Sequence, residues 1–167
     1  MRTKTALYDQ DLYAWAQEQA AHLREGAFQE LDLEHLSEEI EDVGHSQQDA
    51  LASHLLILLT HLLKQALAAV HRPNDFARAE RGWRVTCRTQ RLLIAKRLRR
   101  NPSLRRTVPD ELADAYEIAR GEAAAALELE EDTGPPQCPW TPDEVLTADF
   151  WPEETRRDTA GRDEHDG

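Results

Sequence analysis

The sequence predicts an all-α protein: a helical bundle of four main helices, with a short C-terminal helix and an extended aromatic tail packed on it. Apolar residues recur at three- and four-residue intervals in four long segments, and helix-starting and helix-ending residues bracket those segments. No segment shows the strict alternation of a strand. The length of 167 residues suits one domain. We assign residues 8–152 to a single helical domain, residues 1–7 to a flexible N-terminus and residues 153–167 to a disordered acidic tail.

The first helix is expected between Asp9 or Asp11, which can cap its N-terminus, and Gly26, which can end it. Its expected core face holds Leu12, Trp15, Gln19 and Leu23.

The second helix is expected from Asp32, as a cap, to about Val70. Its first half carries one apolar stripe, formed by Leu33, Leu36, Ile40 and Val43. Gly44 is compatible with a continuous or kinked helix. From Leu51 to Leu67 the segment is apolar on nearly all sides, which predicts the central, most buried element of the fold.

Proline residues mark the remaining boundaries. Pro73 is expected to end the second helix, and Asn74 to cap a third that runs to about Arg100. Pro109 suits the first position of a fourth helix. The segment Thr141-Pro142-Asp143-Glu144 has the cap, first-position proline and acid of a short helix. Trp140, Phe150 and Trp151 are expected to dock on the bundle.

The net charge of −12 is distributed in blocks. Residues 1–50 carry 3 Lys/Arg and 12 Asp/Glu, residues 64–106 carry 13 and 2, and residues 107–167 carry 4 and 18. The basic block can contact nucleic-acid phosphates through Arg84, Arg88 and Arg99, which share an outward face. It can also pair with the acidic blocks of the same chain, which is the interpretation we favour.

Composition also bears on location. The chain contains no run of about 18 uncharged apolar residues and no secretory signal at its start, so we expect neither a membrane span nor any membrane association. Cys87 and Cys138 lie far apart and are expected to be reduced thiols. These features predict a cytoplasmic protein.

Five polar residues are candidates for one polar network between helices: Glu39, His61, Lys64, Gln90 and Arg91. In one interpretation Arg91 pairs with a glutamate, the histidine donates to a carbonyl or a carboxylate, and the network fixes the register of the helices. In the other they form an acid–base or anion-binding site, with pKa values separated by burial. We favour the structural interpretation, because structural ion pairs perturb pKa values in the same way.

Two histidines and a glutamate are the candidate metal ligands in the sequence. His54 and His61 share a helix face, but seven residues span about 10.5 Å, too far for both to bind one ion readily. The sequence lacks Glu-x-x-His, His-Glu-x-x-His, Gly-x-Ser-x-Gly and phosphate-binding glycine loops. We therefore expect no metal site and no cofactor, and assign no catalytic residue.

Several short motifs, in order along the chain, resemble those of a bacterial family called domain of unknown function 29. They are Tyr8-Asp9-x-Asp11 with Tyr13 and Trp15; Leu31-Asp32-Leu33-Glu34 with Leu36; Glu38-Glu39-Ile40-Glu41 with Gly44; Leu59-x-His61-Leu62-Leu63-Lys64; Trp83-x-x-Thr86 with Gln90-Arg91; Asn101-Pro102-Ser103-Leu104; Tyr116; Cys138-Pro139-Trp140; and Phe150-Trp151-Pro152. The resemblance spans residues 8–152 and implies an all-helical, bundle-like domain with no assigned activity. Residues 65–81 depart from it, because family members often have an aromatic residue soon after the lysine.

The function hypothesis that follows is a non-enzymatic interaction or assembly module whose partner is a protein, either another copy or a different chain. The missing catalytic motifs and the uneven charge favour it. Two alternatives stay open: an enzyme or small-anion site built on Glu39, His61, Lys64 and Arg91, and nucleic-acid binding through the third helix.

Overall fold

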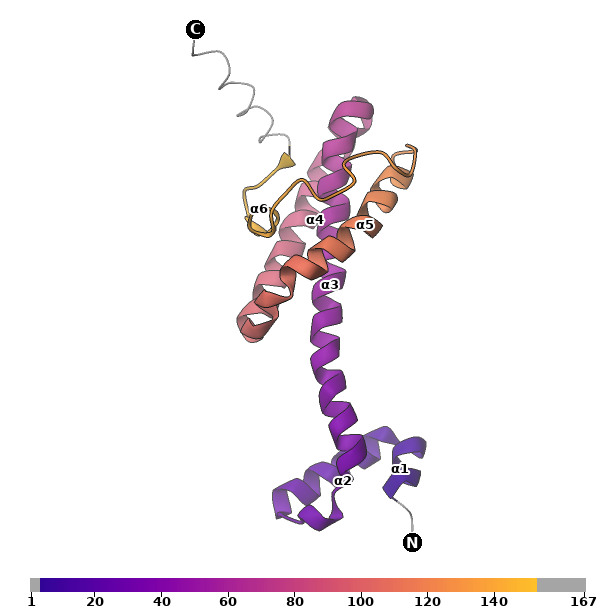
Figure 1. The fold of residues 1–167 in the computed structure, drawn as a ribbon, viewed down its shortest axis with the longest axis vertical. Helices are drawn as coiled ribbons and strands as arrows, with labels where there is room; N and C mark the ends of the chain where they lie inside the picture. The colour runs from indigo at the N-terminus through magenta and orange to yellow at the C-terminus, as the bar shows by residue number, and fades with distance from the viewer. Residues whose placement is uncertain (1–3, 153–167) are drawn as a thin grey trace. The chain divides into compact units, whose positions relative to one another are not determined.

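The structure, a computed structural model, describes residues 4–152, and side chains from residue 7. The described elements are helical: α1 (Lys4–Gln10), α2 (Leu12–Glu25), α3 (Leu33–His71), α4 (Pro73–Arg100), α5 (Val108–Ala126) and α6 (Pro142–Leu146), with 3₁₀ turns η1 (Phe28–Glu30) and η2 (Pro102–Arg106) (Figure 1). The all-α fold predicted from the sequence is confirmed. The chain divides into two compact units, Met1–Gln47 and Gln48–Gly167, and α3 contributes residues to both. The prediction of one domain over residues 8–152 stays a prediction.

In the first unit, α2 begins and ends where its sequence predicts. The Asp11 carboxylate accepts a hydrogen bond from the Ala14 amide at 2.9 Å, and Gly26 ends the helix with φ 72°. A left-handed residue at this position favours glycine, because it has no Cβ. The preceding helix α1 begins at Lys4, inside the segment expected to be flexible. Residues 1–3 lie outside the described part.

The core of the first unit is small and partly polar. Trp15 and Gln19 of α2 are buried as predicted, but Leu12 and Leu23 are half exposed. On α3, the stripe residues Ile40 and Val43 are exposed. This unit therefore leaves part of its apolar surface in contact with water.

The second unit has a larger core, built on the C-terminal part of α3. Leu51, Leu55, Leu58, Leu59 and Leu62 are fully buried, as the apolar sequence predicts. They pack in one cluster with buried residues of the other two long helices of this unit, which are Cys87, Ile94 and Leu98 of α4 and Leu112, Tyr116, Ala119 and Ala123 of α5. Small residues on α5 permit close packing of helices.

The segment after α5 folds back onto this core. Thr141 and Glu144 form the predicted capping box at the start of α6. The rings of Trp140 and Phe150 meet edge to face with centroids 5.9 Å apart, and Trp151 is buried. The predicted docking of the aromatic tail is thus confirmed for residues up to 152. The predicted disordered tail, 153–167, lies outside the described residues.

The boundary between α3 and α4 differs from the prediction in the role of its proline. Pro73 was expected only to end the second helix, with Asn74 as the next cap, but Pro73 opens α4 itself and Arg72 is its N-cap residue. A proline suits the first helical turn, because the amide hydrogen that it lacks would have no partner there. The turn between α3 and α4 is correspondingly short.

Candidate functional site

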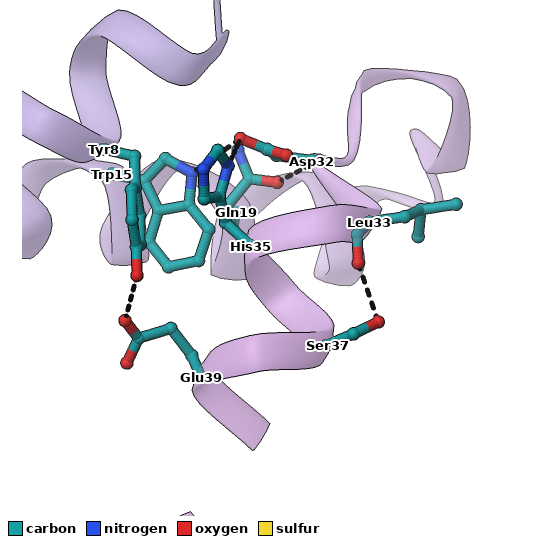
Figure 2. A network of polar contacts seen from close by, with 8 residues as sticks. All are labelled: Tyr8, Trp15, Gln19, Asp32, Leu33, His35, Ser37 and Glu39. Carbon is teal, nitrogen blue, oxygen red and sulfur yellow. Dashed lines mark hydrogen bonds and ion pairs between the residues drawn. The ribbon is translucent and has the colours of Figure 1, made fainter. Parts of the chain in front are cut away.

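The first unit contains a buried polar cluster centred on Asp32 (Figure 2). The Asp32 carboxylate accepts a hydrogen bond from Nε1 of Trp15 at 3.4 Å, and its Oδ2 lies 2.8 Å from Nδ1 of His35. The backbone amide of Asp32 donates to Oε1 of Gln19 at 2.8 Å. These contacts join the start of α3 to the buried face of α2, so Gln19, a polar residue on a core face, has a partner.

Tyr8 closes the cluster from α1. Its ring stacks on His35 with centroids 4.0 Å apart and meets Trp15 edge to face at 5.0 Å. Its hydroxyl donates to Oε1 of Glu39 at 2.8 Å (Figure 2). Tyr8 therefore holds α1 against both helices of the unit.

The pKa values in the cluster follow these contacts. Burial alone would raise the pKa of Asp32, but the hydrogen bonds from His35 and Trp15 outweigh it and lower that pKa. The hydrogen bond to Asp32 raises the pKa of His35. The hydrogen bond to Glu39 raises the pKa of Tyr8 to about 12. Asp32 and His35 thus stabilise each other as an ion pair.

A carboxylate–imidazole pair can orient a general base, as in hydrolytic triads. Here Nδ1 of His35 faces Asp32 and the ring face is covered by Tyr8. The Tyr8 hydroxyl, Nε1 of Trp15 and Oε1 of Gln19 are also engaged with protein partners. The nearby hydroxyl of Ser37 donates to the Leu33 carbonyl at 2.8 Å instead of reaching the imidazole (Figure 2). The geometry of the cluster fits a clasp between helices.

An apolar groove of about 660 Å³ lies between α2 and α3 of the same unit. Its lining includes Leu12, Tyr13, Leu23, Leu36, Ile40 and Val43, with Trp15 and Gln19 beneath them. Tyr13 is 76% exposed, Ile40 69% and Val43 64%. Apolar side chains gathered on one exposed surface mark interaction sites. We call this surface the groove.

Four of the five residues predicted to form one network, Glu39, His61, Gln90 and Arg91, have separate partners. Glu39 belongs to the first unit, where it binds Tyr8, while the other four belong to the second. Among residues 4–152 no hydrogen bond or ion pair joins any two of the five. The predicted meeting of these residues is therefore replaced, for Glu39, His61, Gln90 and Arg91, by separate contacts with backbone groups or with residues outside the set.

Arg91 shows the clearest replacement. The guanidinium is buried and donates to three backbone carbonyls, with Nε to Val145 at 2.9 Å, Nη1 to Ala148 at 3.1 Å and Nη2 to Phe150 at 2.9 Å. It also lies 4.9 Å from the centroid of the Trp151 ring. Burial lowers the pKa of Arg91. The five-donor fork of arginine matches the carbonyls of a folded segment, so Arg91 fastens the C-terminal segment to α4 without a carboxylate.

Gln90 and His61 also have partners outside the predicted network. Oε1 of Gln90 lies 2.8 Å from Nδ1 of His54, and Nδ1 of His61 lies 2.9 Å from the carbonyl of Ile57 one turn earlier. Burial, together with the nearby charge of Lys64, lowers the pKa of His61. A neutral imidazole bonded to its own helix is a structural feature of α3.

The three arginines proposed to contact phosphate differ among themselves. Arg84 forms an ion pair with Glu80 at 2.8 Å and lies 4.6 Å from the centroid of the Trp151 ring. Arg88 and Arg99 are exposed. A surface pocket of about 390 Å³ is lined by Arg81, Arg84 and Arg88 together with Glu80 and Val85. Arg88 and Arg99 thus carry exposed positive charge on α4, whereas Arg84 is half buried and paired with Glu80.

Metal and thiol chemistry find little support in the described part of the chain. No group of three or more His, Cys, Asp or Glu residues within 4–152 is arranged to hold a metal ion. Burial raises the pKa of the Cys87 thiol to about 11 and also raises that of Cys138. Both thiols are therefore protonated and poorly nucleophilic near neutral pH.

One helix of the described residues, α3, is long and apolar enough to cross a membrane by length and composition. Half of its most apolar 18-residue window is buried in the structure, and a core helix of a soluble protein passes the same test. Composition alone thus does not place α3 in a membrane.

The sequence-based search missed Asp32 and His35 as a site. The sequence pattern predicts Asp32 only as the cap of the second helix. The spacing of three between Asp32 and His35 on a helix start was a usable signal, because such residues face each other. The contacts from Tyr8 and Trp15 depend on the tertiary fold and leave no local pattern.

Comparisons with known proteins agree with this picture. A family model described as domain of unknown function DUF29 matches residues 7–151. No curated protein and no solved structure matches the chain. The match covers the described helices from the end of α1 to Trp151. It includes the Asp32 cluster, the groove, and Arg91 with its three backbone carbonyl partners. The chain therefore belongs to the DUF29 family of domains of unknown function.

Proposed function

We propose that the protein is a non-enzymatic interaction module that binds an amphipathic helix of a protein partner in the groove of its first unit. The observation that carries this proposal is the exposure of Tyr13, Ile40 and Val43 along one groove. Leaving such side chains in water is unfavourable by about 25 cal/mol per Å² of apolar area. A partner that covers them recovers this free energy.

The shape of the surface supports a helical partner. Leu36, Ile40 and Val43 recur at intervals of four and three on α3, and α2 forms the opposite wall. A groove between two helices accepts the apolar face of a third, which inserts side chains at the same intervals. Such binding depends on apolar burial and needs no reacting group.

The polar cluster supports the same function as a scaffold. The contacts of Asp32 and Tyr8 hold the helices of this unit together, and α2 and α3 form the walls of the groove. Preorganised walls reduce the entropy lost on binding. We also propose a cytoplasmic location, which the two separate free thiols support.

Site-directed photo-crosslinking in living cells tests this proposal. A benzophenone amino acid replaces Tyr13 in the groove, or Ile118 on α5 as a matched exposed control. We expect discrete adducts from position 13, no equivalent adducts from position 118, and loss of the adducts when Ile40→Asp is added. Equal patterns from both positions, or adducts that persist with Ile40→Asp, would contradict the proposed function.

A further inference from the structure

The second unit carries a pocket of about 390 Å³ on the surface of α4. Three of the five described residues that line it are arginines, which are Arg81, Arg84 and Arg88. Glu80 and Val85 also line it. We call this the basic pocket. Its volume lies within the range of small-ligand sites, which is about 300–1,000 Å³.

Helical spacing brings the three arginines to one side of α4. Arg81, Arg84 and Arg88 are separated by three and four residues, and residues at these intervals are neighbours on a helix surface. Arg81 and Arg88 are exposed, and no ion pair within residues 4–152 involves either of them. Both guanidinium groups can therefore bind an anion from solvent.

Arg84, which lies between them in the sequence, is held in place. Its Nε donates to Oε1 of Glu80 at 2.8 Å, and its guanidinium carbon lies 4.6 Å from the centroid of the buried Trp151 ring. A ligand that meets Arg84 therefore does not have to order this side chain, which reduces the entropy lost on binding.

The charges of the basic pocket suit a dianion. Its described lining carries three positive charges and one negative charge, a net charge of +2. The Glu80 carboxylate opposes an anion, but Arg84 pairs with it. A phosphoryl group carries a charge of about −1.5 to −2 at pH 7. The planar fork of arginine matches the spacing of phosphoryl oxygens, so this group fits the pocket in charge and in geometry.

We propose that the basic pocket binds the phosphoryl group of a small phosphorylated molecule. Arg81 and Arg88 donate hydrogen bonds to the phosphoryl oxygens, and Arg84 adds a fixed positive charge. Val85, which is 57% exposed, offers an apolar contact to the organic part of the ligand. The basic pocket belongs to the second unit and shares no residue with the groove, so this inference and the proposed function stand or fail separately.

A nucleic acid offers the same phosphates but suits this chain less well. The net charge of −12 repels a polyanion, because long-range attraction follows the field of the whole molecule. Trp151, the ring next to Arg84, is buried and offers no face on which a base could stack. A small ligand depends mainly on the local charge of the pocket.

Isothermal titration calorimetry of the full chain in phosphate-free buffer tests the inference, with phenyl phosphate and inorganic phosphate as probes. We expect the unmodified protein to bind phenyl phosphate, and Arg81→Gln/Arg88→Gln to weaken this binding at least about tenfold, because charged hydrogen bonds are lost. The matched control is Arg105→Gln/Arg106→Gln, which makes the same change in net charge at exposed positions of η2 and should bind like the unmodified protein.

A second variant and the second probe sharpen the test. Val85→Glu adds a negative charge to the basic pocket and is expected to weaken binding of phenyl phosphate as well. All three variants change exposed residues and are expected to keep the helical circular-dichroism spectrum. Tighter binding of phenyl phosphate than of inorganic phosphate supports an organic ligand, because only phenyl phosphate can contact Val85. The opposite preference would overturn that part of the inference and assign the pocket to free phosphate.

The inference is overturned if the unmodified protein binds neither probe, or if the two double variants lose affinity equally. Normal binding by Val85→Glu would also contradict it. Salt-sensitive binding of a DNA or RNA oligonucleotide that Arg81→Gln/Arg88→Gln abolishes, without binding of phenyl phosphate, would assign the basic pocket to nucleic acid instead.

Discussion

At the scale of single residues, Arg91 has the best-defined structural role in the second unit. Its three hydrogen bonds hold the carbonyls of Val145, Ala148 and Phe150. Arg91→Met keeps much of the side-chain volume but leaves these buried acceptors unpaired, so we expect a loss of about 3 kcal/mol in the free energy of unfolding. Urea denaturation measures it. Arg105→Met, at an exposed position, should change stability by less than about 0.5 kcal/mol; equal effects of the two would contradict the role assigned to Arg91.

Replacing Gln65 of α3 is expected to stabilise the protein, whereas replacing Arg91 is expected to destabilise it. Its side chain is fully buried, and neither amide atom has a hydrogen-bond partner in the described structure. Replacing an unpaired buried amide with an apolar side chain removes the desolvation penalty, so Gln65→Leu is expected to stabilise the protein by about 1 kcal/mol. Thermal unfolding measures the change. A lower melting temperature would show that the amide is satisfied.

The Asp32–His35 pair predicts a pH dependence. The pKa of His35 is raised on folding, so its contribution to stability is present below about pH 6.5 and is lost as the pH rises through the folded-state pKa. The pKa of Asp32 is lowered, so its contribution is present above about pH 3.9 and is lost as the pH falls through its folded-state value. Both contributions are present near pH 5. We expect the stability difference between unmodified protein and His35→Gln to be larger at pH 5 than at pH 8 in denaturant titrations. An equal difference at both pH values would exclude the ion pair.

At the scale of elements, alanine substitutions at two glycines are expected to have opposite effects on stability. Gly26 ends α2, and Gly44 lies within α3. Gly44 lies within helical α3, and a Cβ there would meet nothing within 4 Å. Gly44→Ala is expected to stabilise α3 by about 1 kcal/mol. Gly26 has φ 72°, where any Cβ is strained, so Gly26→Ala is expected to destabilise α2 by about 1 kcal/mol. Circular dichroism during thermal unfolding distinguishes the two signs, and a destabilising Gly44→Ala would argue for a break in α3.

Local patterns account for most of the elements. Asp11, Gly26, Pro109 and the Thr141 capping box act through neighbours only a few residues away, so their positions can be read from the sequence. Helix α1 carries no comparable signal, because its order depends on the stacking of Tyr8 on His35, 27 positions away. The carbonyl partners of Arg91 lie at least 54 residues away and are backbone atoms, which no side-chain pattern marks.

At the scale of the whole molecule, the groove could also be predicted only in part from the sequence. The stripe of Leu33, Leu36, Ile40 and Val43 was predicted from its spacing. The exposure of this stripe could not be predicted, because periodicity identifies an apolar face but does not show what covers it. The charge blocks are also visible in the sequence, and they favour pairing of the basic block with the acidic blocks of the same chain. Within residues 4–152 the exposed cations Arg81, Arg88, Lys96 and Arg99 have no ion-pair partner, so the pairing favoured from the sequence is not seen for them.

Photo-crosslinking in living cells from position 13 tests the central claim most directly, with the otherwise unmodified protein, Ile40→Asp/Val43→Asp and the exposed control Val70→Asp compared side by side. The account predicts the same discrete adducts in the otherwise unmodified protein and in Val70→Asp, and none in the groove variant, which keeps its helical circular-dichroism spectrum. The same adducts in all three proteins would contradict it.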